Sequence, residues 1–131
     1  MLRYMLDTDT VSFALRGEGG VADRLLECRP SELCLSSVTL AELRFGADAR
    51  RSRKLHDLID TFTQTVAVVP FDSEAADLFG RVAAGLARRG SPIGGFDTLI
   101  AAHALALGLI LVTNNTKHFA RVEGLGTENW V

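Results

Sequence analysis

Cysteine, proline and tryptophan are scarce in this chain, which has two cysteines, three prolines and one tryptophan among 131 residues. Cys28 and Cys34 lack the Cys-x-x-Cys spacing of a thiolate metal site, so the sequence indicates two reduced cysteines. The formal net charge is only −2, and no bulk basic field marks the chain as a nucleic-acid binder. Repeats, linkers and low-complexity blocks are also absent, and we expect a single domain over residues 1–131.

Long hydrophobic runs are absent as well. The apolar run near the N-terminus stops at Asp7 and is too short for a signal peptide. Residues 98–113 are largely apolar, but they are too few to span a bilayer, and Gly108 interrupts them. With 47% hydrophobic and 23% charged residues, the composition is typical of a soluble globular protein. We therefore expect a cytoplasmic protein that makes no contact with a membrane.

The chain does contain short apolar runs that alternate with segments of helical periodicity. Glycines and capping residues mark most of the boundaries between them. The pattern predicts strands at residues 2–6, 33–35, 66–69, 109–112 and 127–130, and helices at residues 10–16, 21–28, 37–49, 51–63, 73–89 and 96–107. Strands that alternate with helices predict an α/β fold with a parallel sheet.

Three carboxylates lie in otherwise apolar elements. Asp97 follows Phe96 in a stretch with almost no other polar residue, and no lysine or arginine lies between Arg89 and Lys117. An unpaired carboxylate buried there would cost several kcal/mol, so it must be protonated, paired or bound to a metal. Asp7 ends an apolar strand, and Glu42 shares a helical stripe with apolar residues. Such acids, far apart in sequence, suggest one convergent acidic site.

Sheet topology explains how these acids can meet. Asp7 and Thr113 follow predicted strands, and ligands of open parallel sheets bind outside the carboxyl ends of the strands. Asp97 lies in the first turn of its helix, which should start near the same edge. Oxygen ligands without cysteine or paired histidine favour Mg²⁺ or Mn²⁺ over zinc. A carboxylate-bound Mg²⁺ is typical of phosphodiester or phosphoryl chemistry.

Four sequence blocks occur in order along the whole chain. They are residues 5–9 (Met-Leu-Asp-Thr-Asp), 36–46 (Ser-Ser-Val-Thr-Leu-Ala-Glu-Leu-Arg-Phe-Gly), 95–104 (Gly-Phe-Asp-Thr-Leu-Ile-Ala-Ala-His-Ala) and 111–119 (Leu-Val-Thr-Asn-Asn-Thr-Lys-His-Phe). Together they resemble the motifs of PIN-domain ribonucleases. The length is similar to that of the VapC-type toxins of prokaryotic toxin–antitoxin pairs.

This resemblance implies a fold, an activity and partners. The implied fold is a three-layer PIN-like α/β domain with a short-stranded parallel sheet flanked by helices. The implied activity is that of an Mg²⁺-dependent endoribonuclease, with Mn²⁺ as a substitute, that hydrolyses RNA such as tRNA to inhibit translation. A VapB-type antitoxin and a homodimer are the implied protein partners. Asp7, Glu42 and Asp97 are the implied metal-binding and catalytic residues.

Further residues are expected to support the site or to contact RNA. Asp9 either supports the site from outside the metal ligands or caps the following helix. Asn115 stands where many relatives carry a fourth acid, and His118 stands where an acid is common. The supporting residues are Asp9, Thr8, Thr113, Asn114 and Asn115. The candidate RNA contacts are Arg44, Arg50, Arg51, Arg53, Lys54 and Lys117.

The three histidines are not expected to ligate a metal. His103 lies on the apolar face of its helix, where a core position is the expected one. His56 and His118 are expected at the surface.

Two functions other than that of a nuclease are compatible with parts of the sequence. Residues 7–10 (Asp-Thr-Asp-Thr) fit the first four positions of the Asp-x-Asp-x-Thr signature of haloacid-dehalogenase-like phosphatases, whose first aspartate is a nucleophile. That family needs further downstream acids, and it leaves Glu42 and Asp97 unexplained. A non-catalytic PIN-like binding module is harder to exclude from sequence. Mg²⁺-dependent RNA cleavage separates the binding module from the enzymes.

Overall fold

The computed structural model describes residues 1–131 and contains one five-stranded sheet in which all neighbouring strands are parallel. The strand order is β3-β2-β1-β4-β5. The strands are β1 (Tyr4–Leu6), β2 (Leu33–Ser36), β3 (Ala67–Val69), β4 (Ile110–Val112) and β5 (Thr127–Glu128). The predicted parallel α/β fold is thus confirmed.

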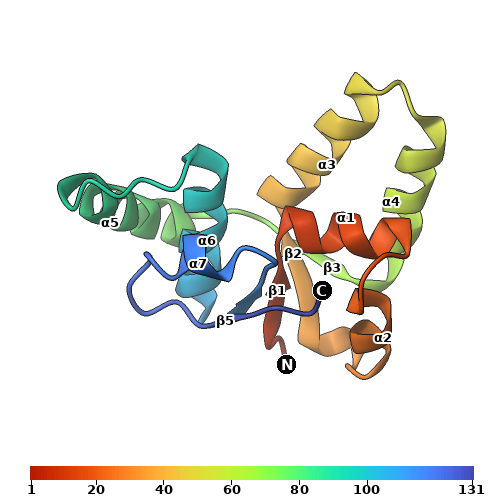
Figure 1. Cartoon of the computed structure of the whole chain (residues 1–131), viewed down its shortest axis with the longest axis horizontal. Coiled ribbons are helices and arrows are strands. Elements are labelled where there is room, and N and C mark those ends of the chain that lie inside the picture. The colour runs from red at the N-terminus through yellow and green to blue at the C-terminus, as the bar shows by residue number, and fades with distance from the viewer.

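Helices cover both faces of the sheet. They are α1 (Thr8–Arg16), α2 (Val21–Leu26), α3 (Ser37–Ala49), α4 (Arg53–Thr65), α5 (Ser73–Arg88), α6 (Gly95–Leu107) and α7 (Thr116–Phe119), with a 3₁₀ turn at Pro30–Glu32. Figure 1 shows α1 to α4 on one side of the sheet and α5, α6 and α7 on the other. This is the three-layer arrangement that the sequence predicted. None of the helices combines the length and the apolar character needed to cross a membrane.

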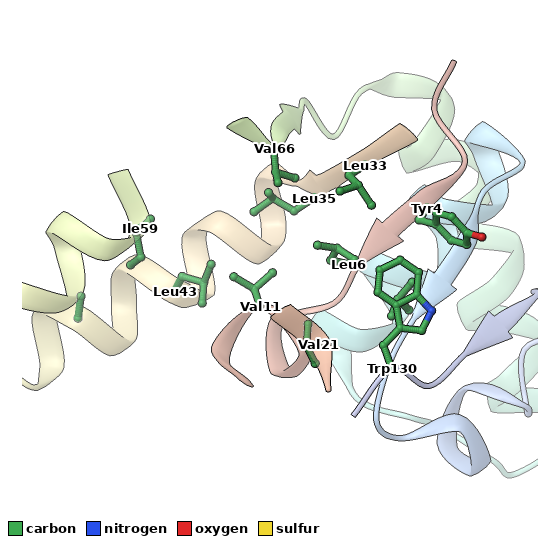
Figure 2. Close-up of a cluster of buried hydrophobic side chains, with 12 residues drawn as sticks. Tyr4, Leu6, Val11, Val21, Leu33, Leu35, Leu43, Ile59, Val66 and Trp130 are labelled. Atoms are coloured by element: carbon green, nitrogen blue, oxygen red, sulfur yellow. The ribbon is translucent and has the colours of Figure 1, made fainter. Parts of the chain in front are cut away.

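Successive side chains along the short strands point to opposite faces of the sheet and pack in two separate hydrophobic cores. Tyr4 and Leu6 of β1 point to the side covered by α1 to α4, whereas Met5 between them points to the side of α5 and α6. In the first core, Val11 of α1 and Leu43 of α3 pack together over the sheet (Figure 2). Since each strand has only two to four residues, this burial on both faces, and not strand length, stabilises the sheet.

One of the three histidines is fully buried. His103 of α6 is 1% exposed, and its Nδ1 atom lies 2.8 Å from Oγ of Ser36 at the end of β2. Burial lowers the pKa of His103, which therefore remains a neutral imidazole near pH 7. The expectation that His103 is a core residue is confirmed.

The order of the strands reverses at β1. From β1 the chain moves outward through β2 to β3, and it then crosses the sheet through α5 and α6 to enter β4 on the other side of β1. Asp7 follows β1 directly, and its backbone N–H donates to the oxygen of Val112 in β4 at 3.0 Å. Asp7 therefore lies at the topological switch point, where open α/β sheets bind their ligands.

Some boundaries differ from the predicted ones. Helix α1 begins at Thr8 because the Asp7 carboxylate caps it by accepting a hydrogen bond from the Thr10 N–H at 2.8 Å. Helix α4 begins at Arg53 because Arg51 has a left-handed backbone, with φ at 52°. The sequence did not predict α7, because four residues are too few to show helical periodicity.

Candidate functional site

Side chains from distant parts of the chain meet in a polar cavity of about 250 Å³ at the switch point. The cavity is lined by Asp7, Thr8, Asp9, Glu42, Asp97, Asn115 and Phe119. These residues come from the end of β1, the first turn of α1, the middle of α3, the first turn of α6 and the region of α7. The structure thus brings together the three acids that the sequence singled out. Their roles as ligands and catalysts remain a prediction.

Asp7 is the most deeply buried of these acids, with 4% of its surface exposed. Burial raises its pKa to about 6, although hydrogen bonds from Thr113 and Thr10 lower it in part. The position at the end of a strand and the start of α1 explains both effects, because the carboxylate is enclosed by the sheet while it accepts the helix-capping hydrogen bond. With a pKa of about 6, the Asp7 carboxyl group is mostly charged at pH 7, but a small fall in pH is enough to protonate it.

Glu42 projects from α3 toward the start of α1. The Thr8 hydroxyl donates a hydrogen bond to its Oε1 atom at 2.6 Å. Burial raises the pKa of Glu42, the hydrogen bond from Thr8 lowers it, and the charges of Asp97 and Asp9 raise it further. Thr8, one of the expected supporting residues, therefore orients a candidate ligand directly.

Asp97 lies in the first turn of α6 and has a partner that the sequence analysis missed. Nε2 of His118 lies 3.0 Å from its Oδ2 atom and 2.6 Å from the backbone oxygen of Ile93. Burial raises the pKa of Asp97, and the neighbouring His118 lowers it in part. The expectation that His118 is a surface residue is wrong, because its side chain is only 22% exposed. The partner is an imidazole from α7, not a lysine or arginine.

The remaining supporting residues differ in how closely they approach the cavity. Thr113 is fully buried behind it, where its Oγ1 atom accepts the N–H of Asn115 at 3.0 Å. Asn115 lines the cavity, as predicted for the position where many relatives carry a fourth acid. Asp9 lines the cavity too. The residue that caps α1 is Asp7, not Asp9. Asn114 does not line the cavity; it is exposed and accepts a hydrogen bond from Asn129.

The basic residues that were predicted to contact RNA do not line the acidic cavity. Arg44 is held between α3 and α4 by Asp60 and His56. His56 is half-buried in this contact and is not the free surface residue that we expected.

Arg53 lies 3.7 Å from Asp57 on the exposed side of α4. Arg51 and Lys54 are exposed near it, and Lys117 is exposed on α7 beside His118. Arg50 lines a smaller hollow of about 150 Å³ that shares Thr8 and Glu42 with the acidic cavity. Arg50 is therefore the one basic candidate that shares a hollow with residues of the acidic cavity.

The donor set fits a hydrated divalent cation. No three acidic, histidine or cysteine side chains are arranged to ligate one ion together. Mg²⁺ usually binds one or two carboxylates and keeps several waters, so the cavity does not need a closed cage. A volume of about 250 Å³ leaves room for such waters. Oxygen-only donors, among them three carboxylates whose pKa values are raised mainly by burial, are suited to a hard cation.

Comparison with known proteins identifies the family of this chain. The PIN domain model matches residues 4–125. The "tRNA(fMet)-specific endonuclease VapC" of Shigella flexneri is 40% identical over 131 residues, which cover 99% of both chains. The protein of the same name from Salmonella typhimurium is 36% identical with the same coverage, and "Ribonuclease VapC2" of Haemophilus influenzae is 37% identical over both full lengths.

Solved structures agree with these relatives. The DNA-bound VapBC complex from Salmonella typhimurium contains a chain with a TM-score of 0.91 and 36% identity, matched over 100% of both chains. VapBC2 from Rickettsia felis, bound to a promoter DNA fragment, gives a TM-score of 0.91 at 30% identity over 99% of this chain and 100% of that one. The haloacid-dehalogenase-like alternative has no support among these matches. The chain belongs to the PIN-domain family and is similar over its whole length to VapC ribonucleases.

Proposed function

We propose that this chain is a divalent-metal-dependent endoribonuclease that acts as the toxin of a type II toxin–antitoxin pair. The observation that carries the proposal is the cavity in which Asp7, Glu42 and Asp97 meet at the switch point of the sheet. The names of the relatives add the class of substrate, since these proteins are described as ribonucleases and tRNA endonucleases.

We assign the three acids as the residues that hold Mg²⁺, either directly or through its bound waters, with Mn²⁺ as a substitute. When bound, such a cation supplies a Lewis acid that lowers the pKa of an attacking water and neutralises charge at phosphorus. The raised pKa values of the acids match this role, because a bound cation would offset their burial and mutual repulsion.

The chain's own residues then orient groups and accept protons. Thr8 occupies Oε1 of Glu42, so the second oxygen is left to accept a proton or a hydrogen bond from a water. A raised pKa makes Glu42 a better proton acceptor than an ordinary surface carboxylate. Arg50, which lines a hollow together with Glu42, and Lys117, which is exposed on α7, would attract phosphates of the RNA.

We further propose VapB-type antitoxin binding and a homodimer. The related structures are described as VapBC complexes. This chain also carries large apolar side chains on its surface, with Leu26 exposed by 86%, Phe45 by 75% and Phe96 by 58%. Exposed apolar groups of this size are suited to protein contacts. An RNA substrate and a protein antitoxin imply action in the cytoplasm.

Cleavage of tRNA by the purified protein tests the proposed function. Initiator tRNA is the first substrate to try, because two relatives are named for it. We expect discrete fragments in Mg²⁺ or Mn²⁺ and none in EDTA, with elongator tRNAs and a duplex RNA as controls. If neither initiator tRNA nor total RNA is cleaved in either metal, the chain is a non-catalytic PIN-like module.

A fourth charge at Asn115 should change metal binding and stability in opposite directions. Asn115→Asp adds a carboxylate to the cavity that already holds Asp7 and Asp97. Mn²⁺ should therefore bind several-fold more tightly, while the metal-free protein should melt at a lower temperature because the added repulsion is uncompensated. The Asn115 side chain makes no capping hydrogen bond to α7, so the helix itself should be little affected.

Calorimetric titration with Mn²⁺ and a melt in EDTA measure both effects. Asn114→Asp is the matched control, because Asn114 is exposed outside the cavity. If Asn115→Asp has the Mn²⁺ affinity and the melting temperature in EDTA of wild type, Asn115 is not part of the metal site.

A further inference from the structure

His118 reaches the candidate metal site from α7. Its Nε2 atom lies within hydrogen-bond distance of both Oδ2 of Asp97 and the backbone oxygen of Ile93. We propose that His118 is a positioning residue that holds the Asp97 carboxylate in the orientation in which it binds the divalent cation. The inference rests on the proposed function, because it takes Asp97 as a ligand of that cation.

The contact with Ile93 fixes which nitrogen of the imidazole carries hydrogen. A backbone carbonyl oxygen can only accept, and it lies 2.6 Å from Nε2. Nε2 must therefore carry a hydrogen, whatever the charge of the ring. The same N–H is directed between Ile93 and Asp97, so His118 donates to the carboxylate at 3.0 Å. The histidine thus acts as a hydrogen-bond donor in both of its protonation states.

The imidazole is itself held firmly, and this makes it able to position another group. Ile93 is 5% exposed and packs in the core between the sheet and α6. Phe119, the next residue of α7, is 1% exposed, and its ring meets the His118 ring edge-on at 5.4 Å between centroids. The donor therefore has a buried anchor on each side, one in the loop before α6 and one in α7.

Asp97 needs such a partner because its own surroundings leave it free to rotate. Its side chain is 41% exposed in the first turn of α6, and His118 is the one side chain that hydrogen-bonds to it. A donor on Oδ2 restricts rotation of the carboxylate and leaves Oδ1 for a cation. Carboxylate ligands of metals are commonly oriented in this way by a hydrogen bond, and loss of that bond typically weakens metal binding 10–100-fold.

A merely structural role would have a different signature. If His118 only fastens α7 to the loop before α6, its loss lowers the melting temperature and leaves the affinity for the cation unchanged. A positioning role predicts a weaker affinity that a second donor of the same reach restores. Glutamine is that donor, because its Nε2 can take the place of the histidine Nε2.

The test compares His118→Leu, His118→Gln and the wild-type chain by calorimetric titration with Mn²⁺. We expect His118→Leu to raise the dissociation constant for Mn²⁺ by roughly tenfold or more, and His118→Gln to recover most of that loss. The matched control is His56→Leu, because His56 also contacts a carboxylate, with Nε2 at 2.8 Å from Oδ1 of Asp48, but does not line the cavity. The control should bind Mn²⁺ like wild type.

Cleavage measured over a Mg²⁺ series adds a second readout. His118→Leu should need a higher Mg²⁺ concentration for half-maximal cleavage, while the KM for RNA at saturating Mg²⁺ stays close to that of wild type. A wild-type affinity for Mn²⁺ in His118→Leu would overturn the inference. So would a His118→Gln variant that binds as weakly as His118→Leu. Melts in EDTA report whether each variant is folded.

Failure of this inference can be told apart from failure of the proposed function. Asp97→Asn is titrated and assayed beside the His118 variants. If Asp97→Asn loses Mn²⁺ affinity and cleavage while His118→Leu keeps both, the site stands and only the role of His118 is wrong. If Asp97→Asn keeps both, the assignment of the site itself is wrong.

Discussion

Replacing Asp97 by asparagine is expected to lower kcat/KM for RNA cleavage by roughly a thousandfold, which corresponds to about 4 kcal/mol of transition-state stabilisation. Asparagine has the same shape, and its amide oxygen can still accept the hydrogen bond from His118. The fold should therefore survive, whereas the charge that attracts the cation is lost. Glu42→Gln and Asp7→Asn should cause losses of a similar order for the same reason.

Purified variants assayed at saturating Mg²⁺ provide the measurement. The matched control is Asp48→Asn, which removes one negative charge from α3 without touching the cavity. It should cleave RNA at the wild-type rate. Activity of Asp97→Asn within tenfold of wild type would show that the acidic cavity is not the place of the reaction.

Asp7→Asn should stabilise the protein in the absence of metal even though it inactivates the enzyme. Burial raises the pKa of Asp7 to about 6 from 3.8. The folded state therefore holds the proton more tightly than the unfolded state does. This favourable contribution is complete below the unfolded-state pKa and is lost as the pH rises through about 6. Above that pH, the folded chain carries a buried charge at a cost.

Asparagine carries no charge at any pH and can cap α1 as aspartate does. In EDTA at about pH 8, Asp7→Asn should exceed wild type by roughly 2–3 kcal/mol in the free energy of unfolding, since each pKa unit is worth about 1.4 kcal/mol. Near pH 4 the difference should shrink toward zero, because wild-type Asp7 is then protonated in the folded state.

Urea unfolding of both proteins at the two pH values measures this difference. Saturating Mg²⁺ should narrow the gap at high pH, because the cation stabilises only the protein that retains its charge. An Asp7→Asn variant that is less stable than wild type in EDTA at high pH would contradict the burial argument. A gain of the same size at both pH values would contradict it too.

Much of the fold could be predicted because the central strands β1 and β2 are buried on both faces. A strand such as β1 is then a short, continuous apolar run, and the acid that ends it stands out. The same contrast singled out Glu42 and Asp97, whose neighbours along their helices are largely apolar. Convergence of the three acids followed from a general rule about the edge of a parallel sheet.

What the sequence could not predict depends on contacts between distant segments. The partner of Asp97 is His118, 21 residues further along, in a helix too short to show periodicity. Arg44 looked available for RNA, but Asp60 and His56 hold it across the α3–α4 pair. Neither pairing can be recognised from the spacing of residues along the sequence. Both follow only once the helices are packed.

The most direct measurement of the central claim is a map of RNA cleavage ends in cells that express this chain without an antitoxin. The wild-type chain should produce a small set of new ends, concentrated in tRNA, that are absent when Asp97→Asn is expressed at the same level. Ends that are the same for wild type and Asp97→Asn, or no new ends with the folded wild-type protein present, would contradict an endoribonuclease that works through the acidic cavity.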